Sequence, residues 1–165
     1  SHVLLIGAGG IGCPAIQYLA AAGVGTISAV DDDIISLSNL QRQVLYSEAE
    51  IGQPKVDAAA KAVRRLNPDI TFHAIKERIT THTSAEILEG VDVVIDGSDN
   101  FATRLAVADA ALAARIPLVS AAVGRFEAQV TGAKLSLDPN HRVLARSRAI
   151  RQVPRLDGAG PRVAP

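Results

Sequence analysis

A glycine-rich turn near the start of the chain constrains the fold more than any other feature. The turn, Gly7-Ala8-Gly9-Gly10-Ile11-Gly12, follows an apolar run over Val3–Ile6 and opens a helix-like segment. The amide groups and partial positive charge at a helix N-terminus favour anions such as phosphate. A strand, a glycine turn and a helix in this order predict the first βαβ unit of a nucleotide-binding domain.

The glycines of this turn have different expected roles. Gly7 and Gly9 allow a tight turn and close approach of the backbone to phosphate, and Gly12 allows close packing of the helix on the strand. Gly7, Gly9, Gly10 and Gly12 are all expected at the nucleotide-binding site. The following helix is expected over residues 10–22, with Ile11, Ala15, Leu19 and Ala22 on its apolar face. The simpler alternative is a plain turn whose small residues serve packing alone.

An acidic residue ends the second apolar strand, which is expected over Thr26–Val30. This residue, Asp31, follows Gly12 by 19 positions, the spacing at which a carboxylate accepts hydrogen bonds from ribose hydroxyls. Asp32 and Asp33 are more consistent with solvated loop charges or helix caps, although Asp33 could help to position a metal.

The remaining periodicity predicts an α/β domain: a Rossmann-like, doubly wound, mostly parallel sheet with helices on both faces. Hydrophobic residues make up 48% of the chain and aromatic residues only 3%, so small aliphatic side chains must form the core, as in buried parallel sheets. The later helices are expected over 54–66, 84–88 and 100–115, and the later strands over 70–75, 91–95, 117–121 and 128–137. The apolar run at 91–95 is typical of a central strand.

Composition excludes several classes of function. The formal net charge is +0, which argues against a wholly basic, nucleic-acid-binding surface. The single cysteine, Cys13, allows no intramolecular disulfide and no cysteine metal cage, and it favours a cytoplasmic location. No apolar run reaches the ~18 residues of a membrane span, so we expect no membrane partner.

An amide and two cations follow the expected ribose-binding strand. Asn39 and Arg42 lie in a long loop, and Lys55 begins the next helix. Arginine and lysine are usually ordinary surface cations, which is the alternative for both. A triphosphate carries about four negative charges, more than a dinucleotide pyrophosphate, and would require these additional groups.

A second group of polar residues, Asp96-Gly97-Ser98-Asp99-Asn100, follows the strand expected at 91–95. Carboxylates there lie at the edge of the sheet where ligands bind in open α/β folds. Asp99 could hold Mg²⁺ beside the phosphates. The alternative is that Ser98, Asp99 or Asn100 caps the helix that follows.

These motifs resemble the HesA/MoeB/ThiF family, the prokaryotic relatives of ubiquitin-activating enzymes. The resemblance covers residues 3 to about 135 and is specific, because the motifs occur together and in the family's order. The matching segments are GAGGIGCP at 7–14, QYLAAAGVG at 17–25, DDD at 31–33, SLSNLQRQ at 36–43, GQPKV at 52–56, LNP at 66–68, DGSDN at 96–100 and IPLVSAAVGRFEAQVT at 116–131.

The resemblance implies ATP-dependent adenylation of the C-terminal Gly-Gly carboxylate of a small ubiquitin-like sulfur-carrier protein, of the molybdopterin or thiamine type. It implies that Gly10 lies against the nucleotide and that Asp31 binds ribose. It assigns the phosphates to Asn39, Arg42 and Lys55, and Mg²⁺ to Asp99, which makes Arg42, Lys55 and Asp99 the expected catalytic residues. Relatives form homodimers. They also carry a cysteine at the position of Cys13, which favours packing over nucleophilic catalysis there.

The chain departs from the family pattern after the shared segments. We expect residues 1–139 to form the adenylation domain, truncated at both ends relative to the family. The segment 140–165 has six arginines, no lysine and three prolines, and we expect it to be irregular or disordered. The cysteine pairs that hold structural zinc in relatives are absent, so no zinc site is expected.

Two other functions remain open at this point. A non-catalytic remnant that binds ATP or a partner would explain the arginine-rich tail. An NAD-dependent oxidoreductase would explain the glycine turn and Asp31, but it leaves Asn39, Arg42, Lys55 and Asp99 without a task.

Overall fold

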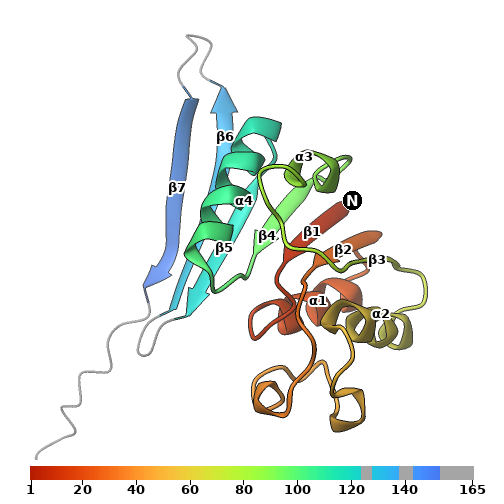
Figure 1. Ribbon diagram of the computed structural model, residues 1–165. Helices are drawn as coiled ribbons and strands as arrows, with labels where there is room; N and C mark the ends of the chain where they lie inside the picture. The colour runs from red at the N-terminus through yellow and green to blue at the C-terminus, as the bar shows by residue number, and fades with distance from the viewer. Residues whose placement is uncertain (124–127, 138–142, 153–165) are drawn as a thin grey trace, which may run out of the picture.

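The computed structural model describes residues 1–123, 128–137 and 143–152 as one sheet with helices on both faces (Figure 1). The strands are β1 His2–Ile6, β2 Thr26–Val30, β3 Thr71–Ile75, β4 Val93–Asp96, β5 Leu118–Val123, β6 Ala128–Leu137 and β7 Val143–Gln152. The α-helices are α1 Gly12–Ala21, α2 Lys55–Leu66, α3 Ser84–Ile87 and α4 Phe101–Ala114. Two short 3₁₀ helices, η1 Leu37–Asn39 and η2 Glu48–Glu50, lie in the long loop before α2.

The strand order β3-β2-β1-β4-β5-β6-β7 confirms the predicted fold class. Strands β1 to β5 pair in parallel, whereas β6 and β7 pair antiparallel. From β1, the strands β2 and β3 are added in turn on one side, and β4 then pairs with the other side of β1. The order therefore reverses between β1 and β4, where the ends of parallel strands leave a crevice for a ligand. β4 is the middle strand, as its apolar sequence indicated.

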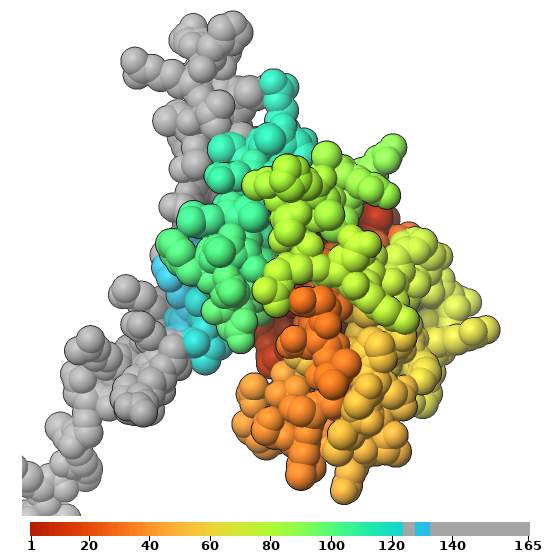
Figure 2. All heavy atoms as spheres, in the orientation of Figure 1, coloured from red at the N-terminus to blue at the C-terminus, as the bar shows by residue number. Residues whose placement is uncertain are grey.

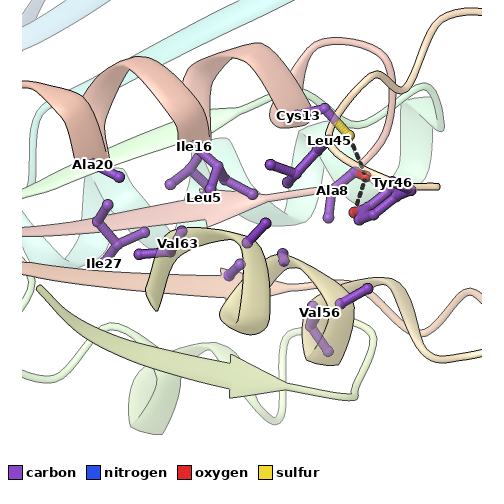
Figure 3. Packing of buried hydrophobic residues seen from close by; sticks show 14 of the residues in the cluster. Leu5, Ala8, Cys13, Ile16, Ala20, Ile27, Leu45, Tyr46, Val56 and Val63 are labelled. Atoms are coloured by element: carbon purple, nitrogen blue, oxygen red, sulfur yellow. Dashed lines mark hydrogen bonds between the residues drawn. The ribbon is translucent and has the colours of Figure 1, made fainter. Parts of the chain in front are cut away.

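Two apolar cores cover the two faces of the sheet. One core packs α1 and α2 against β1 and β2, and its fully buried side chains include Ile16, Ile27 and Val56 (Figure 3). The other core packs α3 and α4 against β1 and β4, through residues such as Leu4, Val94 and Val107. Strand β1 supplies side chains to both cores because alternate residues point to opposite faces.

The buried face of α1 differs from the predicted one. The structure buries Gly12, Cys13, Ile16 and Ala20, whereas Ala22 is exposed and Ala15 and Leu19 are only partly buried. The buried residues Gly12, Ile16 and Ala20 recur at intervals of four positions, as the predicted residues do, but one position later in the chain.

The expectation of an irregular segment from residue 140 is wrong for residues 143–152. These form β7, which pairs with β6 in a register from Leu137–Val143 to Gln129–Gln152. Backbone pairing with a neighbouring edge strand does not require the apolar alternation that the segment lacks. The other residues of the expected tail, 140–142 and 153–165, lie outside the described residues. The division of the chain at residue 139 stays a prediction.

None of the helices in the described part of the chain is long and apolar enough to cross a bilayer.

Candidate functional site

A cavity of about 1070 Å³ opens at the carboxyl ends of β1, β2 and β4, where the strand order reverses. In the space-filling view, red atoms from the start of the chain are visible between the orange loop segment and green α4 (Figure 2). Most of the predicted site residues line this cavity: Gly7, Gly9, Gly10, Asp31, Asn39, Arg42, Lys55 and Asp99. The fold thus brings together four segments that are far apart in sequence.

The glycine turn has a backbone that only glycine tolerates at two positions. Gly7 has a φ of +88°, in the left-handed region, and its N–H donates to the Val30 carbonyl at 2.9 Å. At Gly12 a Cβ atom would lie 1.9 Å from the Gly7 carbonyl oxygen. Gly12, which was also expected at the nucleotide-binding site, does not line the cavity; in the structure it allows the predicted close packing of helix on strand.

The middle of the turn faces the loop that follows β2. A Cβ atom on Gly10 would lie 3.6 Å from Cδ of Arg42, and one on Gly9 would lie 3.7 Å from Nε2 of Gln43. No side chain caps the N-terminus of α1. Of the first three residues of this helix, Cys13 already donates its N–H to the Gly9 carbonyl at 2.9 Å and Pro14 has no N–H, which leaves the amide of Gly12 for an anion.

Asp31 bonds to the glycine turn as well as lining the cavity. Its Oδ2 accepts from the Ala8 N–H at 2.7 Å, and its Oδ1 accepts from the Asp33 N–H at 2.8 Å. A carboxylate can accept about four hydrogen bonds, so both oxygens retain capacity for a ligand hydroxyl. The two bonds fix the orientation of the carboxylate at the end of β2.

Lys55 is tied to Asp33 at both its side chain and its backbone. Its Nζ lies 2.7 Å from Asp33 Oδ2, and its N–H donates to the Asp33 carbonyl at 3.0 Å. The Lys55 side chain is 6% exposed, against 63% for Asp33. The structure thus gives the Asp33 side chain a task that sequence reasoning missed: it pairs with Lys55, while the Asp33 backbone carbonyl accepts from the first amide of α2. An ammonium has three donors, and one bond to Asp33 leaves two for a ligand.

Asn39 and Arg42 lie on the single turn formed by η1 and the residues after it. The Asn39 carbonyl accepts from the Arg42 and Gln43 N–H groups, at 3.1 and 3.0 Å. The Arg42 guanidinium donates through Nη1 to the Ser38 carbonyl, also at 3.1 Å. These short-range bonds direct both side chains of the loop to the same wall of the cavity.

Asp99 lies at the opposite wall, in the loop between β4 and α4. The helix cap is Asn100, whose Oδ1 accepts from the N–H groups of Ala102 and Thr103 at 2.9 and 3.2 Å. Asp99 is exposed and lines the cavity. The alternative that Asp99 serves as the cap is therefore excluded, and its carboxylate is accessible to a cation.

Sequence reasoning missed three further polar groups of this cavity. Arg104 donates to the carbonyls of Ser98 and Ala121. Gln43 is 3% exposed, and its Oε1 has no hydrogen-bond partner in the structure. Arg78 pairs with Asp32, with Nη2 3.2 Å from Oδ2. Of these three residues, only Arg104 had a signal in the sequence, because it lies in the first turn of a helix that begins at the edge of the sheet.

Cys13 is a packing residue. It is fully buried, and its Sγ donates to the Ala8 carbonyl at 3.3 Å, beside the Tyr46 hydroxyl, which donates to the same oxygen at 2.8 Å (Figure 3). Burial raises the pKa of the Cys13 thiol to about 11 and also raises the pKa of Tyr46. A thiol with so high a pKa is a poor nucleophile near neutral pH.

The cavity suits a nucleoside polyphosphate with a divalent cation. Arg42 and Lys55 supply positive charge in the cavity that Gly9 and Gly10 also line, and these two glycines have no side chains to obstruct a ligand. Asp31, Asp32 and Asp33 form the one acidic group of metal-binding geometry within residues 1–123, 128–137 and 143–152. Within this group, Asp32 and Asp33 are paired with Arg78 and Lys55, whereas Asp99 lines the cavity as an exposed carboxylate.

Comparisons with known proteins agree with this geometry. The chain is 48% identical over 131 residues to the SAMP-activating enzyme E1 of Haloferax volcanii, covering 79% of this chain and 48% of that protein. It is 46% identical over 130 residues to the sulfur carrier protein adenylyltransferase of Thermus thermophilus, with coverages of 79% and 48%. The chain thus spans about half the length of these relatives.

A solved structure shares the fold. The tRNA N6-threonylcarbamoyladenosine dehydratase TcdA of E. coli, in complex with ATP, aligns with a TM-score of 0.70 at 28% identity, covering 73% of this chain and 50% of that one. The sequence pattern of the ThiF family matches residues 1–159, nearly the whole chain. Because this match covers more than half of the chain, the chain belongs to the ThiF family.

Proposed function

We propose that this chain carries the ATP-binding site of an adenylyltransferase that activates the C-terminal carboxylate of a ubiquitin-like sulfur-carrier protein. The observation that carries the proposal is the convergence of Asp31, Arg42, Lys55 and Asp99 on one cavity at the glycine turn. The relatives named above support it, since one is called a sulfur carrier protein adenylyltransferase.

The proposed reaction is a nucleotidyl transfer. An oxygen of the carrier carboxylate attacks the α-phosphorus of ATP, a P–O bond forms, and the bond to the β-phosphate oxygen breaks. The products are the acyl-adenylate and pyrophosphate, which takes the electron pair of the broken bond. Such a transfer needs positioning and charge neutralisation more than covalent help from the protein, and nothing in the cavity requires a protein nucleophile.

Each residue of the cavity has a distinct task in this proposal. Asp31 accepts hydrogen bonds from ribose hydroxyls at the end of β2. Asn39, Arg42 and Lys55 bind the triphosphate and neutralise the charge of the departing pyrophosphate. Gly10 leaves room for the nucleotide to lie on the turn.

Asp99 is the residue that would hold Mg²⁺ in this site. Bound there, the cation would neutralise phosphate charge in addition to that provided by Arg42 and Lys55. The exposed carboxylate and the position of Asp99 on the cavity wall support this assignment.

The partners in the proposal are the carrier protein and a second copy of this chain. A homodimer follows from the family resemblance alone and is measurable by analytical ultracentrifugation. The carrier would approach the cavity from the side of β4 and β5, because the nucleoside end is assigned to Asp31, which follows β2.

A binding-only role is the second candidate, because the same residues around the cavity would hold a nucleotide whether or not a transfer follows. Exchange of labelled pyrophosphate into ATP separates the two. The adenylyltransferase predicts exchange that requires Mg²⁺ and a carrier ending in a free Gly-Gly carboxylate, with a carrier lacking its last glycine as control. ATP binding without carrier-dependent exchange would support the binding-only role.

A further inference from the structure

The geometry points to Arg104 as a positioning residue: it fixes the peptide that carries Asp99 and thereby makes nucleotide binding responsive to Mg²⁺. The inference rests on the proposed function and extends it to a residue with no assigned role. Arg104 lies in the first turn of α4 and lines the cavity.

The Arg104 guanidinium joins two segments of the chain. Its Nε and Nη2 donate to the carbonyl oxygen of Ser98 at 2.9 and 2.8 Å, and Nη2 also donates to the carbonyl of Ala121. Ser98 belongs to the loop after β4, and Ala121 belongs to β5. The planar fork of an arginine can hold two such acceptors in fixed positions, which a lysine cannot do.

Ser98 is fixed on its other side as well. Its N–H and its hydroxyl both donate to Asp96 Oδ1, at 3.0 and 2.6 Å. Asp96 is 1% exposed, and its other oxygen accepts from the Ser120 hydroxyl at 3.0 Å. The loop is therefore joined to β5 twice, through Asp96 to Ser120 and through Arg104 to Ala121.

The consequence for Asp99 follows from the planarity of the peptide bond. The Ser98 carbonyl and the Asp99 nitrogen and Cα atoms lie in one plane. Holding that carbonyl on a guanidinium fixes the direction in which Asp99 leaves the loop. Because Asp99 is exposed, its orientation depends on its backbone more than on packing of its own side chain.

Nε and Nη2 of Arg104 already donate hydrogen bonds to the carbonyls of Ser98 and Ala121. We therefore infer that Arg104 acts through Asp99, whereas Arg42 and Lys55 act on phosphate directly. Loss of Arg104 should abolish the effect of Mg²⁺ on ATP affinity and leave the ATP affinity measured without Mg²⁺ unchanged.

The test compares ATP affinity in EDTA and in Mg²⁺, by calorimetry, for the full chain and for Arg104→Gln, Arg104→Lys and Asp99→Asn. In the unchanged chain, Mg²⁺ should tighten ATP binding by about fivefold or more, the lower end of usual coupling between two ligands. Arg104→Gln should match Asp99→Asn, with affinity in EDTA within about twofold of the unchanged chain and little tightening by Mg²⁺. Arg104→Lys should behave like Arg104→Gln, although it keeps the charge.

A matched control and a double variant complete this test. Arg115→Gln, at the exposed end of the same helix, should leave the Mg²⁺ response unchanged. Adding Arg104→Gln to Asp99→Asn should cause no further loss, since both changes remove one function. Equal weakening in EDTA and Mg²⁺, or full recovery by Arg104→Lys, would overturn the inference in favour of a direct phosphate contact.

A second readout needs no nucleotide. Amide ¹⁵N relaxation in the unliganded chain should show residues 97–100 to be rigid, and flexible on the picosecond to nanosecond scale in Arg104→Gln, with Asp99→Asn unchanged. A rigid loop in folded Arg104→Gln would overturn the positioning role. If the unchanged chain fails to bind ATP at all, the proposed function fails, and the relaxation result still decides whether Arg104 fixes the loop.

Discussion

The Lys55 ammonium lies 2.7 Å from the Asp33 carboxylate, although 22 positions separate the two residues. The pair joins the start of α2 to the end of β2 and holds a buried lysine on the wall of the cavity. Orientation of a phosphate-binding lysine before the ligand arrives lowers the entropy lost on binding.

Lys55 should contribute to binding of the β- and γ-phosphates and little to binding of the nucleoside. We expect Lys55→Met to weaken ATP binding by about tenfold or more, the effect of losing a hydrogen bond to a charged group, and to weaken AMP binding much less. Competition against a fluorescent ATP analogue gives both constants. Lys61→Met, on the exposed side of the same helix, is the matched control. Equal losses for ATP and AMP would contradict the assignment.

Asp31 should act at the ribose, so its effect should be the same for ATP and AMP. The unchanged chain is expected to bind ATP more tightly than 2′-deoxy- or 3′-deoxy-ATP, by about 1 kcal/mol for each lost hydrogen bond. Asp31→Asn should remove most of this preference. The variant also disturbs the bond to Ala8, so circular dichroism must show an intact fold. A preference for ribose that survives in Asp31→Asn would place the ribose elsewhere.

Gly12→Ala should destabilise the fold strongly, because its Cβ would meet the Gly7 carbonyl oxygen at 1.9 Å. We expect a loss of about 3 kcal/mol or more in the free energy of unfolding, at the upper end for overpacked sites. Urea unfolding measures this loss. Gly25→Ala is the control, since its Cβ would lie at an ordinary 3.6 Å from Ser1. A stability of Gly12→Ala equal to that of the control would show that the turn can relax.

Cys13 should make the protein less stable in alkali. Burial raises its pKa from 9.0 to about 11 in the folded state, so the unfolded chain loses its proton first as the pH rises. Stability from this group is complete below pH 9 and is lost toward pH 11, by about 2–3 kcal/mol in total. Urea unfolding at a series of pH values gives the free energy of unfolding for the unchanged chain and for Cys13→Ala. The two plots of this free energy against pH should differ in slope only between pH 9 and pH 11. Parallel slopes would contradict the raised pKa.

The same burial predicts slow reaction with thiol reagents. At pH 8 the thiolate fraction of Cys13 should be about a hundredfold below that of a free thiol. Reaction with a chromogenic disulfide should be slow in the native protein and fast in urea.

The local pattern of the sequence was sufficient to predict most of the elements. The predicted helix over 100–115 corresponds to α4, Phe101–Ala114, and the extended segment over 128–137 is β6. Each of these segments could be recognised from its own residues, through a helix-capping residue, a hydrophobic periodicity or an apolar run. The predicted face of α1 was wrong by one position, because Ala15 and Leu19 adjoin the buried Ile16 and Ala20 and the apolar pattern does not choose between the two sets.

The parts of the site that could not be predicted depend on contacts distant in sequence. The pairing of Asp33 with Lys55 and of Arg104 with Ser98 and Ala121 requires the positions of three strand ends, which no local pattern encodes. Likewise β7 forms by pairing with β6. Asp31 and Asp99 could be predicted because they follow strands, and Asn39, Arg42 and Lys55 because of the charge of a triphosphate and the family resemblance, whereas the partners of these residues could not.

The most direct test of this account is calorimetric titration of the chain with ATP and Mg²⁺, with NAD as the comparison ligand and Arg42→Ala alongside. The account predicts ATP binding that is about tenfold or more weaker in Arg42→Ala, as expected for a lost charged contact, and no measurable binding of NAD. Binding of NAD without dependence on Mg²⁺, or ATP binding unchanged in Arg42→Ala, would contradict it.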